Sequence, residues 1–556
     1  MLKTAQHTPL AKNPRLAGFL LSFAGLMVTL LMVLPVIALL WESMQGLHDG
    51  DGVLQRLSSS VLTTYISNSV MTVVFTLIFA CSLAIPTAWW CSRYEFVGRR
   101  WLQWLPIFPL AIPAYIAAYV YTDMLDYAGP VQSTLRQWFG WQSPHDYYFP
   151  DIRTLTGASV LLAFTLFPYL YLLLRHAFDN SNANLTNAAR LLGASKRRLF
   201  FTLHLPMARP ALAMGCTLIA METLADYGTV KLFAVSTLTT AVYDSWLIYG
   251  SLATAAQIAS LLLLFVLLLT GLERYQRQRQ RFYDVRNGVK AERNQAGFWR
   301  TGIIWCAILT IVIIGFALPV SVLFYYAWLY SAENLQSPLL APMFSSFSLG
   351  LIAAFVTLLM AILLNARVRF QPGRVATSQL SLASLGYAIP GTVLAIGLLI
   401  PFTHLDFAIN NLLEYWQQAP VGLVFSGTSV ALVVAYVIRF AALANGTLHA
   451  RYQGIPPSLD QASQLLGDQP HSTFWNIHLP LLRPAMLSAL LLVFIECIKE
   501  LPASLLLRPF ELETLATFVF QYASDEHLEH AALAALFICL VSLLPLFFLS
   551  RTHRLE

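Results

Sequence analysis

Four acidic residues interrupt segments that are otherwise strongly apolar. They form two pairs, Glu222 with Asp226 and Glu496 with Glu500, which occupy matching positions in the two parts of the chain. Side chains four residues apart lie on one face of a helix, so the spacing predicts two helices that each present a pair of carboxylates. Carboxylate oxygens are hard ligands, which suit hard metal cations better than apolar solutes. Four of them along one path could pass such a cation.

A second interpretation of these acids is structural. A lone ionised acid at the centre of a bilayer costs on the order of 3 kcal/mol, so each acid must face a partner or a wet pathway. Glu496 could pair with Lys499 one turn further along, and Glu222 could be protonated or bonded to neighbouring helices. Counted from Pro210 and Pro484, Glu222 and Glu496 lie roughly 18 Å along their helices, past the bilayer midplane. The sequence leaves both interpretations open.

The composition indicates a protein that crosses a membrane many times. Of its 556 residues, 57% are hydrophobic and only 11% are charged, whereas soluble chains are about 25% charged. Apolar runs of roughly 20 residues recur, which is the length a helix needs to cross the bilayer core. We therefore expect an all-α polytopic membrane protein with about 12 transmembrane helices. The helices are predicted to begin near residues 16, 61, 101, 154, 208, 251, 299, 347, 379, 420, 484 and 529.

The basic residues gather on one side of the predicted helices. With a cytoplasmic N-terminus, 28 of the 34 Lys and Arg residues, Arg439 among them, fall in inward-facing segments. This bias follows the positive-inside rule and predicts that both termini are cytoplasmic. The densest basic run, residues 273–298, is expected to be a cytoplasmic linker between a first half, residues 1–272, and a second half, residues 299–556. No nucleic-acid-binding fold accompanies this run, so nucleic acid is not an expected partner.

An internal repeat relates the two halves. Residues 187–211 align with residues 461–485 without a gap, and the two acid pairs are related by the same constant offset. Six helices return the chain to the side on which it started, so the two halves are expected to be duplicated in the same orientation. A shorter echo pairs residues 111–118 with residues 388–395. It contains two prolines that are predicted to kink their helices, Pro113 and Pro390.

Each repeat encodes a short helical hairpin. A helical turn ends at Gly193 or Gly467, where glycine can take the left-handed conformation that terminates a helix. Ser195 or Asp468 could then cap a second helix, which ends before a Leu-Pro pair. Small residues on the first helix would allow a partner surface to approach closely. The same hairpin at matching positions in both halves indicates two docking loops.

The repeated loop resembles the signature loop of binding-protein-dependent ABC importer permeases. That signature is Glu-Ala-Ala, three residues, Gly, nine residues and Ile-x-Leu-Pro, and both copies keep its spacing, although Asn and Gln replace Glu. The resemblance implies that each loop, residues 187–206 and 461–480, docks as a coupling helix onto one of two ATP-binding cassette subunits. It assigns the coupling positions to Asn187, Ala188, Ala189, Gly193, Leu205, Pro206, Gln461, Ala462, Ser463, Gly467, Leu479 and Pro480. ATP and Mg would be bound by those partner subunits, and this chain is expected to bind no cofactor of its own.

The segments after the loops, residues 221–246 and 495–524, look most like ferric-iron importer permeases. The resemblance implies import of ferric iron from the periplasm across the bacterial inner membrane, with delivery by a periplasmic ferric-iron-binding protein. Glu222, Asp226, Glu496 and Glu500 would line the translocation path. No permanent metal site is expected, because tight binding in the path would stop release. Fused two-half permeases also occur among importers of thiamine and phosphonates, which stay open as alternative substrates.

The source of energy separates the remaining classes of protein. The sequence contains no G-x-x-x-x-G-K-[ST] phosphate-binding loop, so the chain is not its own ATPase by that route. An ion-coupled secondary transporter could also have twelve helices and buried acids, but it would have no need of two docking loops. A membrane enzyme is disfavoured because neither a clustered nucleophile nor a His pair accompanies the acids. We therefore expect a transporter subunit in the lipid bilayer rather than an enzyme.

Overall fold

The computed structural model describes residues 14–49, 52–180, 183–278, 293–331 and 339–552. Within these residues the fold is almost entirely helical, which confirms the predicted all-α class. The one strand pair among them is two residues long and parallel: β1 (Tyr94–Glu95) lies beside β2 (Asn294–Gln295).

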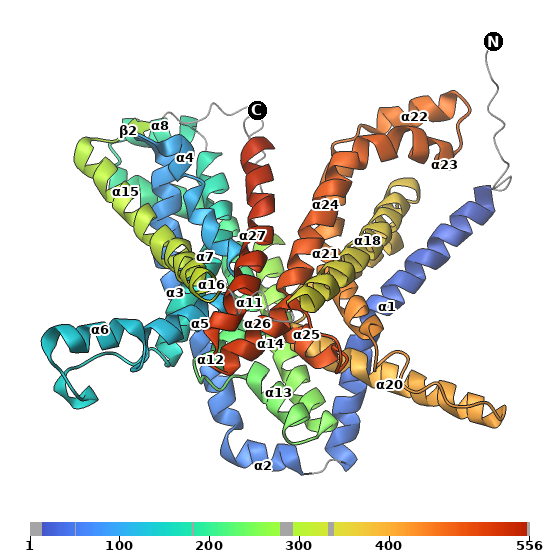
Figure 1. Cartoon of the computed structure of the whole chain (residues 1–556). Coiled ribbons are helices and arrows are strands. Elements are labelled where there is room, and N and C mark those ends of the chain that lie inside the picture. Colours follow the sequence, from blue (N-terminus) through green and yellow to red (C-terminus); the bar gives the residue numbers. More distant parts are fainter. Residues whose placement is uncertain (1–13, 50–51, 181–182, 279–292, 332–338, 553–556) are drawn as a thin grey trace.

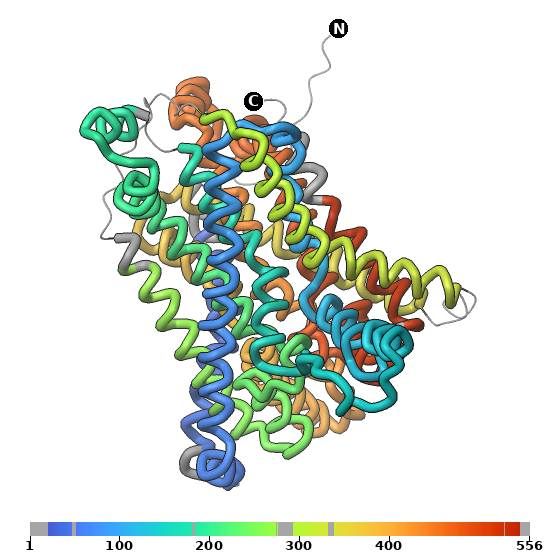
Figure 2. Tube along the Cα trace, turned by 90° about the vertical axis from the view of Figure 1, so that its left-hand side faces the viewer, coloured from blue at the N-terminus to red at the C-terminus, as the bar shows by residue number. Residues whose placement is uncertain are grey.

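Nine helices in the described part of the chain are long and apolar enough to cross a membrane. They are α1 (Pro14–Asp49), α3 (Leu62–Arg93), α7 (Leu155–Asp179), α14 (Leu252–Gln278), the run from α15 (Phe298–Val312) to α16 (Leu318–Leu329), α18 (Leu340–Phe370), α20 (Gly391–Tyr415), α21 (Ser429–Gln453) and α24 (Leu479–Lys499). Figure 2 shows α3, in blue, running along the bundle. Two more predicted segments are shorter helices: α11 (Arg209–Ala225) has 17 residues, and the apolar part of α27 (Leu528–Thr552) covers Glu529–Leu544.

The predicted helices near residues 101 and 379 are broken rather than continuous. The first is divided into α4 (Arg99–Leu102), the 3-10 helix η1 (Leu105–Ala111), α5 (Ala114–Leu125) and α6 (Pro130–Phe139), with a bend of 85° at the break. The second is divided into α19 (Arg374–Ala383), η5 (Gly386–Ala388) and α20. Pro113 and Pro390 stand directly before α5 and α20 in extended conformation. Proline has no N–H and disfavours helical backbone in the residue before it, so the predicted kinks are complete breaks.

The duplication seen in the sequence recurs in the elements. Matched short helices include α8 (Ala183–Leu191) with α22 (Pro457–Leu465), α9 (Lys196–Leu199) with α23 (Pro470–Thr473), α12 (Gly228–Leu232) with α25 (Pro502–Leu507), and α13 (Leu238–Leu247) with α26 (Leu515–Ser524). Even single hydrogen bonds are repeated: Ser69 accepts from the Leu238 amide at 2.8 Å, and Ser346 accepts from the Leu515 amide at 2.6 Å. In Figure 1, α8 and α22 lie on separate lobes at one side of the bundle, and α1 begins and α27 ends on that same side.

The first helix of each half packs against the opposite half. Helix α1 contacts α18, α19 and α20, while α15 contacts α3 and η1. The approach of α1 to α20 is close enough to require glycine. A Cβ atom at Gly397 in α20 would lie 2.5 Å from the carbonyl oxygen of Pro35 in α1. This exchange of helices joins the two halves by packing, in addition to the chain that connects them.

Replacing Gly397 with Ala should lower the thermal unfolding midpoint of the purified protein. Alanine favours a helix over glycine by roughly 0.5–1 kcal/mol, but overpacking against a rigid backbone costs about 1–3 kcal/mol. Gly446→Ala is the matched control, because Gly446 also lies inside a helix and a Cβ atom there meets nothing within 4 Å. We expect the two variants to shift the midpoint in opposite directions. Equal shifts would refute the α1–α20 contact.

The end of the predicted linker is fixed to the first half. β2 pairs with β1, and Arg293 forms ion pairs with Glu95 at 3.9 Å and with Asp179 at 3.7 Å. Residues 279–292 of the linker lie outside the described residues. The domain boundaries at residues 272 and 298 therefore stay a prediction.

Candidate functional site

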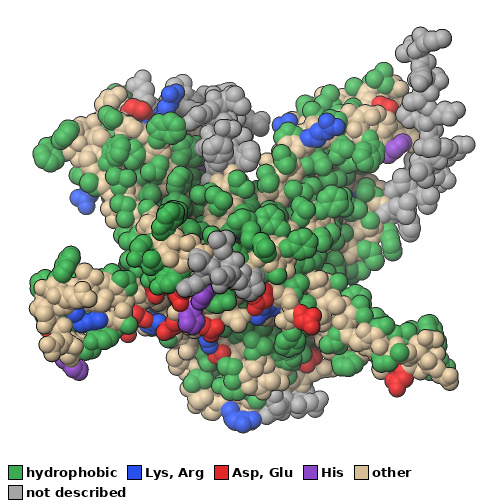
Figure 3. All heavy atoms as spheres, viewed as in Figure 1, with side chains coloured by type: hydrophobic (Ala, Val, Ile, Leu, Met, Phe, Trp, Pro, Cys, Tyr) green, Lys and Arg blue, Asp and Glu red, His purple; other side chains and the backbone are tan. Residues whose placement is uncertain are grey.

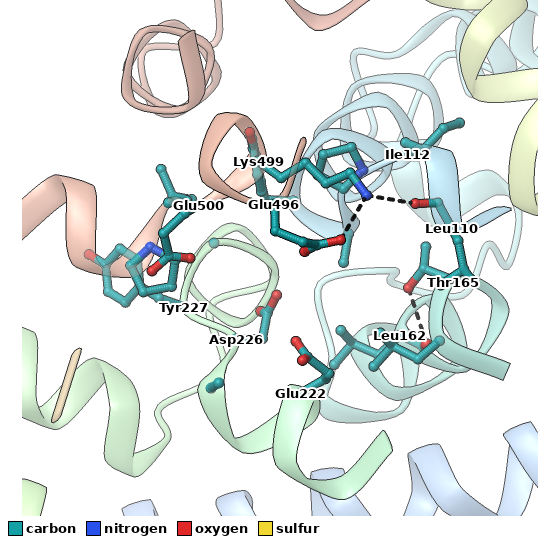
Figure 4. Close-up of a pocket in the computed structure, with 18 of the residues that line it drawn as sticks. Leu110, Ile112, Leu162, Thr165, Glu222, Asp226, Tyr227, Glu496, Lys499 and Glu500 are labelled. Atoms are coloured by element: carbon teal, nitrogen blue, oxygen red, sulfur yellow. Dashed lines mark hydrogen bonds and ion pairs between the residues drawn. The ribbon is translucent and has the colours of Figure 1, made fainter. Parts of the chain in front are cut away.

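A cavity of about 130 Å³ lies between the two halves, and all four predicted acids line it. Figure 4 shows the carboxylates of Glu222, Asp226 and Glu496 turned toward the same space. Glu222 and Asp226 come from the first half, and Glu496 and Glu500 from the second. The structure thus brings together matched side chains that are far apart in the sequence.

The predicted continuous helix face across each acid pair is wrong. Helix α11 ends at Ala225, one residue before Asp226, and α24 ends at Lys499, one residue before Glu500. Both second acids have extended backbone, with ψ of 127° and 116°. Each pair therefore spans a helix end and a turn, although both members still reach the cavity.

The second acid of each pair holds the next short helix. Asp226 accepts hydrogen bonds from the Thr229 amide at 2.9 Å and the Val230 amide at 3.2 Å at the start of α12. Glu500 accepts from the Ala503 amide at 2.9 Å at the start of α25. A carboxylate near a helix N-terminus satisfies amides that have no partner within the helix. Asp226 and Glu500 therefore have a structural role, while Glu222 and Glu496 lie one turn earlier on their helices.

Two basic side chains in the cavity were not identified as site residues from the sequence. The Nζ atom of Lys499 lies 3.6 Å from Glu496, so the predicted pairing one turn along is confirmed. Arg439 Nη1 lies 3.8 Å from Glu500 Oε1, and both side chains are buried. The prediction that Arg439 is inward-facing is therefore wrong, since it lies within α21. The signal was available, because an isolated charge inside an apolar helix marks a site as strongly as an acid does.

The cavity is not symmetric although the chain is duplicated. The positions that match Arg439 and Lys499 in the first half are Thr165 and Ala225, and both also line the cavity. Both cations thus come from the second half. Four acids and two bases leave the lining with a formal charge of −2. In the described residues no group of three or more His, Cys, Asp or Glu side chains is arranged to hold a metal ion. The lining can attract a cation without enclosing it.

The two repeated loops have the predicted hairpin shape. Gly193 and Gly467 are left-handed, with φ of 81° and 87°, as their helix-ending role requires. Ser195 caps α9 by accepting from the Arg198 amide at 3.3 Å, as predicted. Asp468 does not cap α23; its carboxylate instead accepts from the hydroxyls of Ser463 and Ser472, both at 2.9 Å.

The predicted coupling positions differ in their exposure. Asn187, Ala188, Gln461 and Ala462 are exposed on the first helix of each loop, and Ala189 is half-buried. Ser463, which was expected to leave room for a partner surface, is buried and bonded within the loop. Leu205 and Leu479 are half-buried, and so is Pro206, while Pro480 is exposed.

A leucine pair lies at the tip of each loop, immediately before the glycine. Leu191 and Leu192 are 90% and 88% exposed, and Leu465 and Leu466 are 90% and 86% exposed. Large apolar side chains presented together at a loop tip mark an interaction surface. These leucines are therefore candidates for docking. The sequence motif did not identify them as docking residues.

Each loop is attached to the helical bundle by a buried histidine with different partners. In the first half, Arg93 donates to His204 Nδ1 at 3.1 Å, so that nitrogen accepts. In the second half, His478 Nε2 donates to Asp460 at 2.7 Å, and Arg369 donates to the same carboxylate at 2.7 Å. Burial alone would raise the pKa of Asp460, but the hydrogen bonds from Arg369 and His478 outweigh it and lower this pKa. The second loop is therefore held by an ionic network around Asp460, and Thr186 stands at the matching position of the first loop.

His204 gives the first loop a dependence on pH. Burial, assisted by the guanidinium groups of Arg93 and Arg190, lowers the pKa of His204 to about 4 from an ordinary value of 6.5. Between these values the unfolded state binds more protons than the folded state, so stability falls as pH falls. The loss grows as the pH falls from about 6.5 to about 4 and then levels off.

The expected result is a lower thermal midpoint at pH 5 than at pH 7.5, with a smaller loss in His204→Gln. Glutamine keeps an acceptor for Arg93 but does not titrate in this range. The readout is the difference between the two proteins, since other groups titrate in both. Equal losses of midpoint in the two proteins would show that His204 is not the group responsible.

Comparison with known proteins agrees with this architecture. The sequence profile of the family described as "Binding-protein-dependent transport system inner membrane component" matches residues 80–282 and 358–553, one segment in each half. The Fe(3+)-transport system permease protein FbpB 2 of Haemophilus influenzae is 25% identical over 547 residues, covering 97% of this chain and 99% of that protein. The ferric transport system permease protein FbpB of Actinobacillus pleuropneumoniae is 24% identical, covering 96% of this chain and 77% of that protein.

A shorter similarity extends to a permease for another solute. The molybdenum transport system permease protein ModB of Haemophilus influenzae is 28% identical over 168 residues, covering 30% of this chain and 70% of that protein. Two matched segments in one chain, together with the nearly full-length relatives, confirm the resemblance to fused two-half permeases. The chain therefore belongs to the family of binding-protein-dependent transport system inner membrane components, with two copies of the family's unit in one polypeptide.

Proposed function

We propose that this chain is the permease of an ATP-driven importer that passes ferric iron from the periplasm to the cytoplasm across the bacterial inner membrane. The observation that carries the proposal is the cavity between the halves, in which four carboxylates meet two basic groups. Its formal negative charge and hard oxygen atoms suit a hard cation. The names of the two nearly full-length relatives support the same cargo.

Energy enters through the two loops. Each of two ATP-binding cassette subunits, which hold ATP and Mg, docks on one exposed leucine pair. The π-helical turn Phe200–His204 leads through α10 (Leu205–Met207) and Ala208 into α11, and Phe474–His478 leads directly into α24. Because Glu222 lies on α11 and Glu496 on α24, a displacement of either loop is transmitted through helical backbone to the cavity. This arrangement supports alternating access driven from the cytoplasmic side.

The basic side chains reduce the repulsion among the carboxylates when the cavity holds no cation. Lys499 and Arg439 offset part of the negative charge when no cation is present. A cation delivered by a periplasmic ferric-iron-binding protein competes with these groups for Glu496 and Glu500. Since the carboxylates are already engaged by tethered cations, the incoming ion is held weakly enough to leave. This chain therefore needs no permanent metal site.

Uptake of radiolabelled ferric iron, in cells with and without this chain, tests the proposal. Thiamine, phosphonate and molybdate are tested in parallel, both as competitors of iron uptake and for their own uptake. We expect loss of ferric-iron uptake alone when the chain is removed. Loss of thiamine or oxyanion uptake with iron uptake intact would refute the cargo. Transport that continues without any ATPase partner would refute the energy source and favour an ion-coupled transporter.

A further inference from the structure

Each half extends one arm sideways from the bundle. Arm 1 consists of residues 127–152 and contains α6, and arm 2 consists of residues 403–428 and contains the distal part of α20. Figure 1 shows α6 and the end of α20 projecting to opposite sides, away from the lobes that carry α8 and α22. The arms follow the matched breaks at Pro113 and Pro390, so they are products of the same duplication.

Arm 1 presents an apolar helix face that the rest of the described chain covers only in part, since Val131 and Leu135 are half-buried and the end of the helix is exposed. Val131, Leu135 and Trp138 follow the i, i+4, i+7 spacing of one helix face, and Phe139 adjoins them. Trp138 is 78% exposed and Phe139 is 63% exposed. A helix whose apolar face points away from its own protein needs another apolar environment.

Arm 2 repeats the same pattern with different residues. Leu405, Ile409, Leu412 and Trp416 follow i, i+4, i+7, i+11 along α20 and its last turn. Leu412 is 48% exposed and Trp416 is 62% exposed. By contrast, the proximal part of α20 is packed against α1 through Gly397. The uncovered stripe therefore begins where the contact with the bundle ends.

Internal hydrogen bonds stabilise the arms and hold much of their charge. Arg136 donates to the Tyr127 carbonyl at 2.8 Å and to the Tyr147 hydroxyl at 3.0 Å, and Trp141 stacks on Tyr147. In arm 2, Asp406 is buried and accepts hydrogen bonds from the amides of three residues, Val424, Phe425 and Ser426. These bonds keep charge off the apolar faces and fix the direction of each stripe.

The surface chemistry changes at the level of the arms. In Figure 3 a broad apolar surface covers the bundle above them, and acidic, basic and histidine side chains gather between them near the centre. An ion cluster also lies at the base of arm 1, where Arg153 bonds Asp126 at 2.6 Å and Glu526 at 3.3 Å. The arms thus lie along the boundary between an apolar belt and a polar surface.

We propose that the two arms lie in the outer leaflet of the bilayer, at the boundary between phospholipid headgroups and acyl chains. Amphipathic helices with Trp and Phe on their apolar face bind at this depth. Because the two arms extend to opposite sides at one level, they can enter the same leaflet together. They hold the outer ends of α5 and α20, and so fix the depth of the two proline breaks. Pro113 itself lines the cavity.

Spin labels on the arms test this placement. The label is attached in Trp138→Cys or Trp416→Cys, in a background where the exposed Cys306 is replaced by Ala. The labelled full chain, assembled with its partners, is placed in vesicles of phosphatidylethanolamine and phosphatidylglycerol. Gln137→Cys and Glu414→Cys are matched controls, because both are exposed on the polar faces of the same helices. Accessibility to oxygen and to a soluble nickel chelate is then compared.

We expect the labels at 138 and 416 to be at least about threefold less accessible to the nickel chelate than the labels at 137 and 414. Equal accessibility would overturn the proposal. Protection that arises only after a periplasmic binding protein is added would also overturn it, and would assign the arms to protein docking. Spin–spin broadening between labels would also overturn the proposal, and would assign the arms to contact with a second copy of this chain. If either Trp variant fails to assemble, Phe139→Cys and Leu412→Cys repeat the test on the same faces.

Spin-label accessibility reports the depth of the arms in the bilayer and not the transport of iron. Failure of this inference therefore leaves the proposed ferric-iron function unaffected, and failure of iron uptake leaves the depth of the arms unaffected.

Discussion

The double substitution Leu192→Ala and Leu466→Ala should abolish transport while leaving the membrane protein folded. Both side chains are almost fully exposed in this chain, so truncating them removes little of its own packing. In the proposed complex each would be buried in an ATPase groove. Burying a leucine contributes about 2 kcal/mol, so each truncation should weaken the docking of its own ATPase subunit by roughly 30-fold. Copurification of those subunits and ferric-iron uptake are measured together.

The matched control is a second double Leu→Ala variant away from the loops. Leu264 and Leu487 are 52% and 59% exposed, and they lie on α14 and α24. Their truncation removes the same number of atoms from exposed positions, one in each half. We expect this control to keep both its ATPase partners and its uptake. If the loop variant also kept its partners, the leucine pairs would not be the docking surface.

The two loops need not contribute equally to coupling. The second loop is held by the bonds among Arg369, Asp460 and His478, whereas Thr186 stands in the first half where Asp460 stands in the second. A stiffer loop transmits a displacement to its helix with less local deformation. Each single leucine variant, compared with the double, would measure how the coupling is divided.

The duplication is the feature that the sequence predicted best. A constant offset required no knowledge of tertiary structure, and it correctly indicated that distant acids belong to matching elements. The left-handed glycines of both loops were also predictable, because few residues other than glycine adopt that backbone without strain. The meeting of Glu222 with Glu496 in one cavity follows from the same duplication.

Helix ends were the main source of error. Four-residue spacing predicts a shared face only while the helix continues, and here it stops one residue before Asp226 and Glu500. Each of these carboxylates bonds to amides at the start of a following helix, which competes with continuation of the first. Pro502 at the start of α25 was a usable signal for such a restart.

Arg439 was misplaced for a related reason. The positive-inside rule counts charges in loops, and an uncertain helix boundary allowed a buried arginine to be counted with them. Its pairing with Glu500 joins α21 to the turn after α24, and such a contact cannot be read from local pattern. The arms escaped prediction because their apolar faces resemble parts of spanning helices. Only the structure shows that Trp138 and Trp416 on these faces are exposed.

Neutralising Glu222 and Glu496 should remove ferric-iron uptake while assembly with the ATPase subunits persists. Glu222→Gln and Glu496→Gln together change the formal charge of the cavity lining from −2 to zero. At an effective dielectric constant of about 20, two unit charges roughly 5 Å apart interact by about 3 kcal/mol. Loss of two such interactions should reduce uptake by at least about 100-fold. Neither side chain is bonded to a helix N-terminus, as Asp226 and Glu500 are, so the fold should be retained.

Charge can be separated from shape by adding Lys499→Gln to that variant. In Glu496→Gln the ammonium group of Lys499 loses its carboxylate partner 3.6 Å away and repels an incoming cation. Removing the lysine returns a formal charge of −1 to the lining, so uptake should recover in part. Glu414→Gln with Glu511→Gln is the control, because both of these glutamates are exposed outside the cavity. Unchanged uptake in the Glu222 and Glu496 variant, at equal expression, would show that the cavity is not the iron path. Loss of uptake without any recovery on removing Lys499 would mean that the carboxylates act by shape or bonding rather than by charge.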